Sequence, residues 1–263
     1  MVVGKAGSRI VILLGFLLGM TACLCSCNKF SESEKITRKK CQKIKVLVVT
    51  GGHGFEKESF FAMFGSFDDI EYAEAVQQEQ SNVFEDVTGW NWDVIVLYDM
   101  TQEISPQGRK NFLRLLENGV GVVSLHHSIA SYQNWPEYRE IIGVKYYLRQ
   151  TEEDGVVHLQ GEYKHDVDVR VHVENKKHPI TQGMSDFVIR DEVYKKSVFE
   201  KDNLVLLSTD HPDSDRPLCW TRKYGRSKVC CIQLGHGPEA YADANYRRLV
   251  ERAIRWCAGR SDK

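Results

Sequence analysis

The sequence lacks the marks of several common functional classes. Its formal net charge is only −1 over 263 residues, so it has no excess of the basic side chains that bind nucleic-acid phosphates. No two cysteines stand in the Cys-x-x-Cys spacing of thiolate zinc sites. The Gly-x-Gly-x-x-Gly pattern of dinucleotide-binding loops is missing as well. We therefore expect neither a nucleic-acid partner nor a nucleotide cofactor.

The beginning of the chain has an apolar run that is too short for a confident membrane span. This run, Ile10 to Met20, is shorter than the roughly 20 residues that a transmembrane helix needs. Lys5 and Arg9 precede it, and small residues and cysteines follow it, which is the order typical of a secretory signal. We interpret residues 1–27 as a lipoprotein signal peptide, with an uncleaved signal anchor as the alternative.

The end of this signal predicts a lipid anchor. Leu24-Cys25-Ser26-Cys27 resembles a bacterial lipobox, in which the last cysteine is lipidated and becomes the mature N-terminus. Cys27 is the predicted site because polar residues follow it directly, and Cys23 is the alternative. Residues 28–43 are rich in Lys and Glu and are interpreted as a tether. We expect an exported protein, anchored to a bacterial membrane on its periplasmic or cell-surface side.

The remaining cysteines give no sign of a disulfide-stapled fold, although export would place them in an oxidising compartment. They are odd in number and show no close-spaced framework; they are Cys41, Cys219, Cys230, Cys231 and Cys257. A single disulfide is left open.

The fold is organised around the segment 120–128, Val-Gly-Val-Val-Ser-Leu-His-His-Ser. Its apolar part is typical of a strand that is buried on both faces of a parallel sheet. Further strands are expected over 44–50 and 92–98, and helices over 57–67 and from Ser105 to about Gly119. This β-α-β-α-β order predicts an α/β domain, over residues 44–260, with a mostly parallel sheet and helices on both faces.

The second half of the domain changes character and predicts a β-rich insertion. Valines at 167, 169, 171 and 173 alternate with polar residues, a period of two that indicates a strand with one solvated face. Short strands are expected over 187–189, 204–208, 218–221 and 229–234, and an amphipathic helix over 245–258. His158, His165 and His172 lie in polar surroundings and are interpreted as surface residues.

Several polar side chains follow the predicted strands directly. In an open α/β sheet the ligand site lies outside the carboxyl ends of the strands, so these residues are expected to meet in one crevice. Imidazole is useful there both as a base near neutral pH and as a ligand for zinc-like metals. The residues concerned are His53, Asp99, His126, His127 and His236, although His53 alone would also fit a plain glycine-rich turn.

These motifs together resemble the ThuA-like (trehalose utilisation) family over about residues 44–258. The resemblance rests on Gly51-Gly52-His53-Gly54-Phe55, on the segment ending in His126-His127-Ser128, and on four later motifs; these are His178-Pro179-Ile180, Asp191-Glu192-Val193-Tyr194, Trp220 with Gly225-Arg226, and Leu234-Gly235-His236-Gly237. It implies a flavodoxin-like, class I glutamine-amidotransferase-like fold and a role in disaccharide catabolism, particularly of 3-keto-sugars. Related amidotransferases carry a cysteine nucleophile after the central strand, where this chain has Leu125-His126-His127, so glutaminase chemistry is not expected.

The sequence suggests a role for each candidate residue. His126, His127 and Glu192 are the expected catalytic residues, in a lyase, hydrolase or isomerase acting on a keto-sugar or related disaccharide. A divalent metal such as zinc on His53, His127 and His236 is one expectation, and a metal-free hydrogen-bonded cluster is the other. Expected sugar contacts are Asp99, Trp135, Tyr194 and Trp220.

Two other functions stay open on sequence grounds. The chain is alternatively a carbohydrate-binding lipoprotein without catalysis, in which aromatic side chains stack on sugar rings and the histidines only donate or accept hydrogen bonds. A scaffold role would leave the clustered histidines unexplained. The sequence also leaves open whether the chain forms a homo-oligomer.

Overall fold

The computed structural model describes residues 42–78 and 82–260, and within them five strands form the parallel half of a nine-stranded sheet. These strands lie in the order β2 (Ile70–Val76), β1 (Ile44–Gly51), β3 (Val94–Asp99), β4 (Gly121–Leu125) and β13 (Ser227–Ile232). This is the 2-1-3-4-5 order of flavodoxin-like sheets. The signal segment, its cysteines and residues 28–41 of the tether lie outside the described residues.

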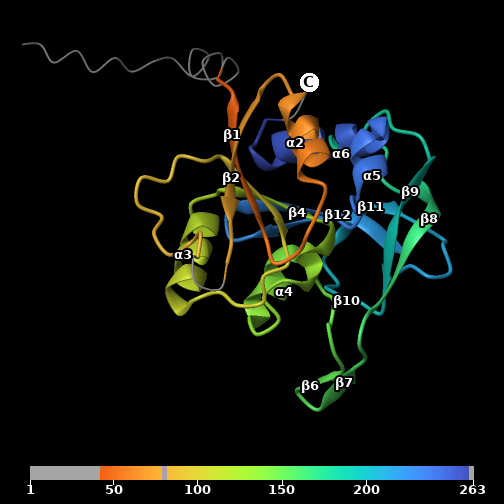
Figure 1. Ribbon diagram of the computed structural model, residues 1–263, viewed down its shortest axis with the longest axis horizontal. Coiled ribbons are helices and arrows are strands. Elements are labelled where there is room, and N and C mark those ends of the chain that lie inside the picture. Colours follow the sequence, from red (N-terminus) through yellow and green to blue (C-terminus); the bar gives the residue numbers. More distant parts are fainter. Residues whose placement is uncertain (1–41, 79–81, 261–263) are drawn as a thin grey trace, which may run out of the picture. The chain divides into compact units, whose positions relative to one another are not determined.

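Four antiparallel strands extend the sheet beyond β13. They follow in the order β12 (Pro217–Tyr224), β11 (Leu204–Ser208), β8 (Glu162–Val173) and β9 (Phe187–Lys195). Two small ribbons complete the strands, β5 (Val144–Lys145) with β10 (Val198–Phe199) and β6 (Thr151–Glu153) with β7 (Val156–His158). The β6–β7 ribbon stands out from the rest of the domain (Figure 1). The expected β-rich insertion is therefore present.

Helices cover both faces of the parallel strands (Figure 1). Helices α2 (Lys57–Gly65), α5 (Pro238–Ala242) and α6 (Ala244–Cys257) pack on one face, and α3 (Pro106–Glu117) and α4 (Pro136–Ile142) pack on the other. Side chains alternate between the two cores along each strand, so that Val46 and Val48 face α2 while Leu47 and Val49 face α3. The α/β class that the sequence predicts is confirmed. None of the described helices is long and apolar enough to cross a membrane.

Strands β2 and β9 differ from the sequence prediction for physical reasons. Strand β2 was missed because it forms an edge of the sheet and carries mostly half-buried and exposed side chains instead of an apolar run. Strand β9 continues to Lys195, although the apolar pattern predicts an end at Ile189. Its second half carries Asp191 and Glu192, which are buried although they are charged.

Candidate active site

A cavity of about 220 Å³ opens where strands β1, β3, β4 and β13 end. The structure brings all four histidines from the predicted strand ends into its lining and adds a fifth, His165; the others are His53, His126, His127 and His236. Glu192 and Tyr194 enter the same cavity from β9, at the other end of the sheet. The residues with acid–base chemistry therefore come from elements that are far apart in sequence.

His126 stands at a sharp turn between β4 and the 3₁₀ helix η1 (His126–Ala130). Its φ of +49° is unusual for a residue other than glycine, and such backbone strain is often found at functional sites. Its Nδ1 donates a hydrogen bond of 2.9 Å to the Gln233 carbonyl oxygen, which leaves a lone pair on Nε2. The Tyr194 hydroxyl lies 3.0 Å from this Nε2, where it can donate. Burial, and next the neighbouring His127, lower the pKa of His126 well below its ordinary value, so the ring is neutral.

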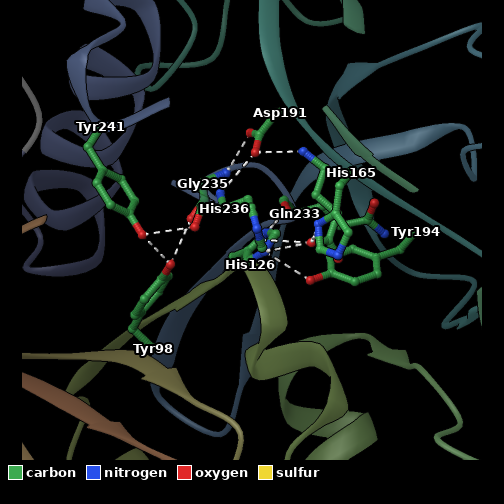
Figure 2. Close-up of polar contacts among 10 residues, drawn as sticks. Tyr98, His126, His165, Asp191, Tyr194, Gln233, Gly235, His236 and Tyr241 are labelled. Atoms are coloured by element: carbon green, nitrogen blue, oxygen red, sulfur yellow. Dashed lines mark hydrogen bonds and ion pairs between the residues drawn. The ribbon is translucent and has the colours of Figure 1, made fainter. Parts of the chain in front are cut away.

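Glu192 is the carboxylate of the cluster. Its Oε2 lies 2.7 Å from His165 Nδ1, 2.8 Å from His236 Nδ1 and 4.0 Å from His126 Nε2. The contact with Glu192 raises the pKa of His236 above its ordinary value. His236 Nδ1 also lies 3.1 Å from His126 Nε2 (Figure 2). The His126 ring, with a lone pair on Nε2, therefore faces the His236 ring, whose protonated form is stabilised by Glu192.

The neighbouring carboxylate, Asp191, holds the main chain around the site (Figure 2). It accepts hydrogen bonds from the backbone N–H groups of Gly235, His236 and Glu192 at 2.7, 2.9 and 2.9 Å. Burial raises the pKa of Asp191 to about 6 despite these hydrogen bonds. Asp191 therefore fixes Glu192 and His236 relative to each other.

Two tyrosines support the same loop from the other side. Tyr98 donates to the Gly235 carbonyl oxygen at 2.8 Å, and Tyr241 donates to the His236 carbonyl oxygen at 3.1 Å. Their hydroxyl groups lie 2.6 Å apart (Figure 2). The loop at the end of β13 is thus held by side chains from β3, β9 and α5.

His53 and His127 form a separate pair in the cavity. Their ring centroids lie 4.6 Å apart, and His127 Nε2 is 3.4 Å from the Tyr98 carbonyl oxygen. Burial, and next the charge of His53, lower the pKa of His127 to about 3. His127 has no carboxylate partner among the described residues, so it is less suited than His126 to proton transfer.

The described residues contain one group whose ligand atoms could hold a metal ion, and it differs from the predicted set. His126, Glu192 and His236 each offer a ligand atom within 4.8 Å of the others. Two imidazoles and one carboxylate are a ligand set that suits zinc. A metal-binding histidine usually donates its other ring N–H to a carbonyl or carboxylate oxygen, as His126 Nδ1 does to the Gln233 carbonyl oxygen. Of the predicted set, only His236 belongs to this group; His53 and His127 do not.

Three of the four predicted sugar contacts do not line the cavity. Trp220 is fully buried and donates from Nε1 to the Ile142 carbonyl oxygen at 2.8 Å. Trp135 is buried, with its ring against Phe112 of α3 and Tyr138 of α4. Asp99 is also fully buried, and burial raises its pKa to about 7. A position in the sequence does not tell whether a tryptophan faces the core or a ligand. Tyr194 is the one member of the set that lines the cavity.

His165 is the site residue that the sequence interpretation missed. It lies at a bulge in β8, between Lys164 and Val167, and the next residue, Asp166, has a φ of +53°. The bulge brings His165 to Glu192. The sequence pattern does indicate this position, because His165 continues the spacing of two that the buried valines follow. The polar residues around it favoured the surface interpretation.

The described cysteines take no part in the site. Cys219, Cys230, Cys231 and Cys257 are buried and free, and none of them lines the cavity. Burial raises the pKa of the Cys230, Cys231 and Cys257 thiols, which makes them poor nucleophiles.

Residues 45–257 match the sequence model of the ThuA family, described as trehalose utilisation. A ThuA-like protein from Parabacteroides merdae has a similar structure, with 19% identity, a TM-score of 0.70, and coverage of 84% of this chain and 92% of the other. A ThuA-like protein from Bacteroides uniformis has 22% identity and a TM-score of 0.61, with coverage of 83% of this chain and 92% of the other. A cytoplasmic protein from Salmonella typhimurium has 14% identity and a TM-score of 0.59, with coverage of 81% of this chain and 99% of the other. These identities show a shared fold alone, and no curated protein matches the sequence.

Proposed function

The chain belongs to the ThuA (trehalose utilisation) family, and we propose that it is an exported lipoprotein of carbohydrate catabolism that acts on keto-sugars. One observation carries the proposed chemistry, namely the meeting of three imidazoles at one buried carboxylate. His126, His165 and His236 all lie within 4.0 Å of Glu192 Oε2, inside a cavity that opens to solvent. A cavity in which acids and bases lie within hydrogen-bond reach of one another is the usual setting for proton transfer.

A keto-sugar offers a C–H bond that such a site can attack. The carbonyl acidifies the neighbouring C–H groups, so a base can remove a proton if a donor stabilises the enediolate that forms. The lone pair on His126 Nε2 is the base in this proposal. His236, whose proton is favoured by Glu192, is the donor to the developing oxyanion. The enediolate then has two outcomes. It can take the proton back from His126 at the former carbonyl carbon while the hydroxyl of the neighbouring carbon loses its own proton and becomes the carbonyl, which isomerises the sugar. It can instead re-form the carbonyl and expel the glycosidic oxygen from the β-carbon, and that oxygen takes the proton held by His126.

A metal-assisted form of the same chemistry is the second candidate. The observation that favours it is the group of His126, Glu192 and His236, which would hold a zinc-like ion. Such an ion supplies Lewis-acid polarisation of a carbonyl or hydroxyl oxygen when it is bound. In that case Tyr194 and His165 are the remaining side chains of the cluster that can donate or accept a proton.

The reaction can be tested with a 3-keto-disaccharide in D₂O. We expect deuterium to enter next to the carbonyl, observed by NMR, together with isomerised sugar or released monosaccharide. Glu192→Gln keeps the shape of the side chain and should abolish exchange. Tight sugar binding with neither exchange nor cleavage would instead support the non-catalytic carbohydrate-binding lipoprotein.

A further inference from the structure

A second cavity adjoins the candidate active site, and we propose that it holds the non-reacting sugar unit of a keto-disaccharide. The inference rests on the proposed function, because it assigns the oxidised ring to the histidine cavity. Leu148 lines both cavities. Met100 lines the first, and Gln102, which donates to the Met100 carbonyl oxygen at 2.7 Å, lines the second. The two cavities therefore share part of their wall and lie next to each other.

The sizes of the two cavities favour a ligand that fills both. The histidine cavity measures about 220 Å³, which is below the range of about 300–1,000 Å³ that is usual for small-molecule sites. The second cavity adds about 330 Å³. The two together fall within that range, whereas the histidine cavity by itself suits a ligand of about one ring.

The side chains of the second cavity suit binding without chemistry. They supply amide, hydroxyl and charged groups, which donate to and accept from hydroxyl groups; they include Gln102, Gln133, Asn134, Arg149 and Thr151. Over residues 42–78 and 82–260, no histidine and no cysteine lines it. Among the described residues that line the two cavities, the imidazole groups lie in the histidine cavity, so we assign the reacting ring to that cavity and the part of the ligand that does not react to the second one.

The charges of the second cavity favour a neutral ligand over an anion. Lys145 Nζ is paired with Glu153 Oε1 at 2.5 Å, and Asn134 donates to Glu103 at 2.7 Å. The two cations of the lining, Lys145 and Arg149, are thus balanced by two carboxylates. Arg149 has no side-chain partner among the residues that the structure describes, so its guanidinium is available to sugar hydroxyl groups.

The test compares a 3-keto-disaccharide with the matching 3-keto-monosaccharide. We expect the wild-type protein to show a higher kcat/KM for the disaccharide. Arg149→Ala and Asn134→Ala should reduce this preference about three- to tenfold, mainly through KM, because each removes a hydrogen bond to the second unit. Arg114→Ala is the matched control; it removes an exposed arginine of α3 outside both cavities and should keep the wild-type preference.

The outcomes separate the two proposals. Turnover of both sugars with the same preference in wild type, Arg149→Ala and Asn134→Ala overturns the second subsite and leaves the proposed function standing. A clear preference for a sugar with an anionic second unit overturns the neutral ligand. If neither sugar is turned over, the proposed function fails. Calorimetry with the unoxidised disaccharide then decides the subsite, since weaker binding to Arg149→Ala supports it and equal binding overturns it.

Discussion

The carboxylate of Asp191 on β9 accepts a hydrogen bond of 2.9 Å from the backbone N–H of His236, the residue that lies just beyond β13. The same carboxylate holds the N–H of Glu192. The carboxylate of the cluster, Glu192, and the proposed proton donor, His236, are thus positioned by a group that does not line the cavity. Asp191 acts through its neighbours and is a positioning residue.

Asp191→Asn should therefore lower activity without removing any cavity side chain. An amide has one acceptor oxygen where the carboxylate has two, so at least one backbone N–H loses its partner. We expect kcat to fall about 10- to 100-fold, the usual effect of a residue that orients site groups, with KM much less changed. Asp186→Asn is the control, because Asp186 also accepts from a backbone N–H, that of Val173, but lies outside the cavity. Equal losses in both variants would contradict the positioning role.

His126→Ala should remove the proposed base. Loss of general acid–base catalysis typically costs about 10²–10⁴-fold, so deuterium exchange into the keto-sugar should slow by that order. Circular dichroism should show an unchanged fold. His172→Ala, which removes a histidine of β8 outside the cavity, should retain wild-type exchange. If His127→Ala is impaired and His126→Ala is not, the assignment of the base is wrong.

Zinc should stabilise the protein if His126, Glu192 and His236 bind it. A ligand at about 100 times its Kd stabilises the folded state by about 2.7 kcal/mol, so added Zn²⁺ should raise Tm by several degrees. Glu192→Gln should lose most of this shift, whereas Glu153→Gln, outside the histidine cavity, should keep it. Elemental analysis of untagged protein gives the resident metal. Substoichiometric metal that is lost on dialysis would contradict the metal-assisted form.

The stability of the fold should depend on the protonation of Asp99. Burial raises the pKa of Asp99 from 3.8 to about 7, so the folded state binds its proton more tightly than the unfolded state. The protonated Asp99 thus contributes on the order of a few kcal/mol to the free energy of unfolding. This contribution is fully present below pH 3.8 and is lost as the pH rises through about 7. Asp99→Asn should flatten this dependence in urea unfolding followed from pH 5 to 8. Asp168→Asn, at an exposed position, should not change it.

Lipid anchoring can be tested at the predicted cysteine. Cys27→Ser should move the protein from the membrane fraction to the soluble fraction, because the acyl chains of a bacterial lipoprotein supply the anchor. Cys23→Ser is the matched control and should stay in the membrane fraction. The reverse pattern would identify Cys23 as the lipidated residue.

The sequence alone determined the architecture around the site. Apolar runs at 44–50, 92–98 and 120–125, separated by helical segments, require a parallel sheet with right-handed crossovers. The carboxyl ends of parallel strands share one edge, so the placing of His53, His126, His127 and His236 in one cavity followed from the strand order. This inference needed no side-chain coordinates, because it depends on chain direction.

Only the tertiary structure decided which of these groups work together. Glu192, Tyr194 and His165 reach the cavity from antiparallel strands at the far end of the sheet, and His165 does so at a bulge in β8. Trp135 and Trp220 are buried core side chains. The sequence could not show this, because a tryptophan packs equally well in a core or against a sugar ring. An apolar run in the sequence indicates a strand, but the distance between two side chains depends on how the whole sheet twists and folds back on itself.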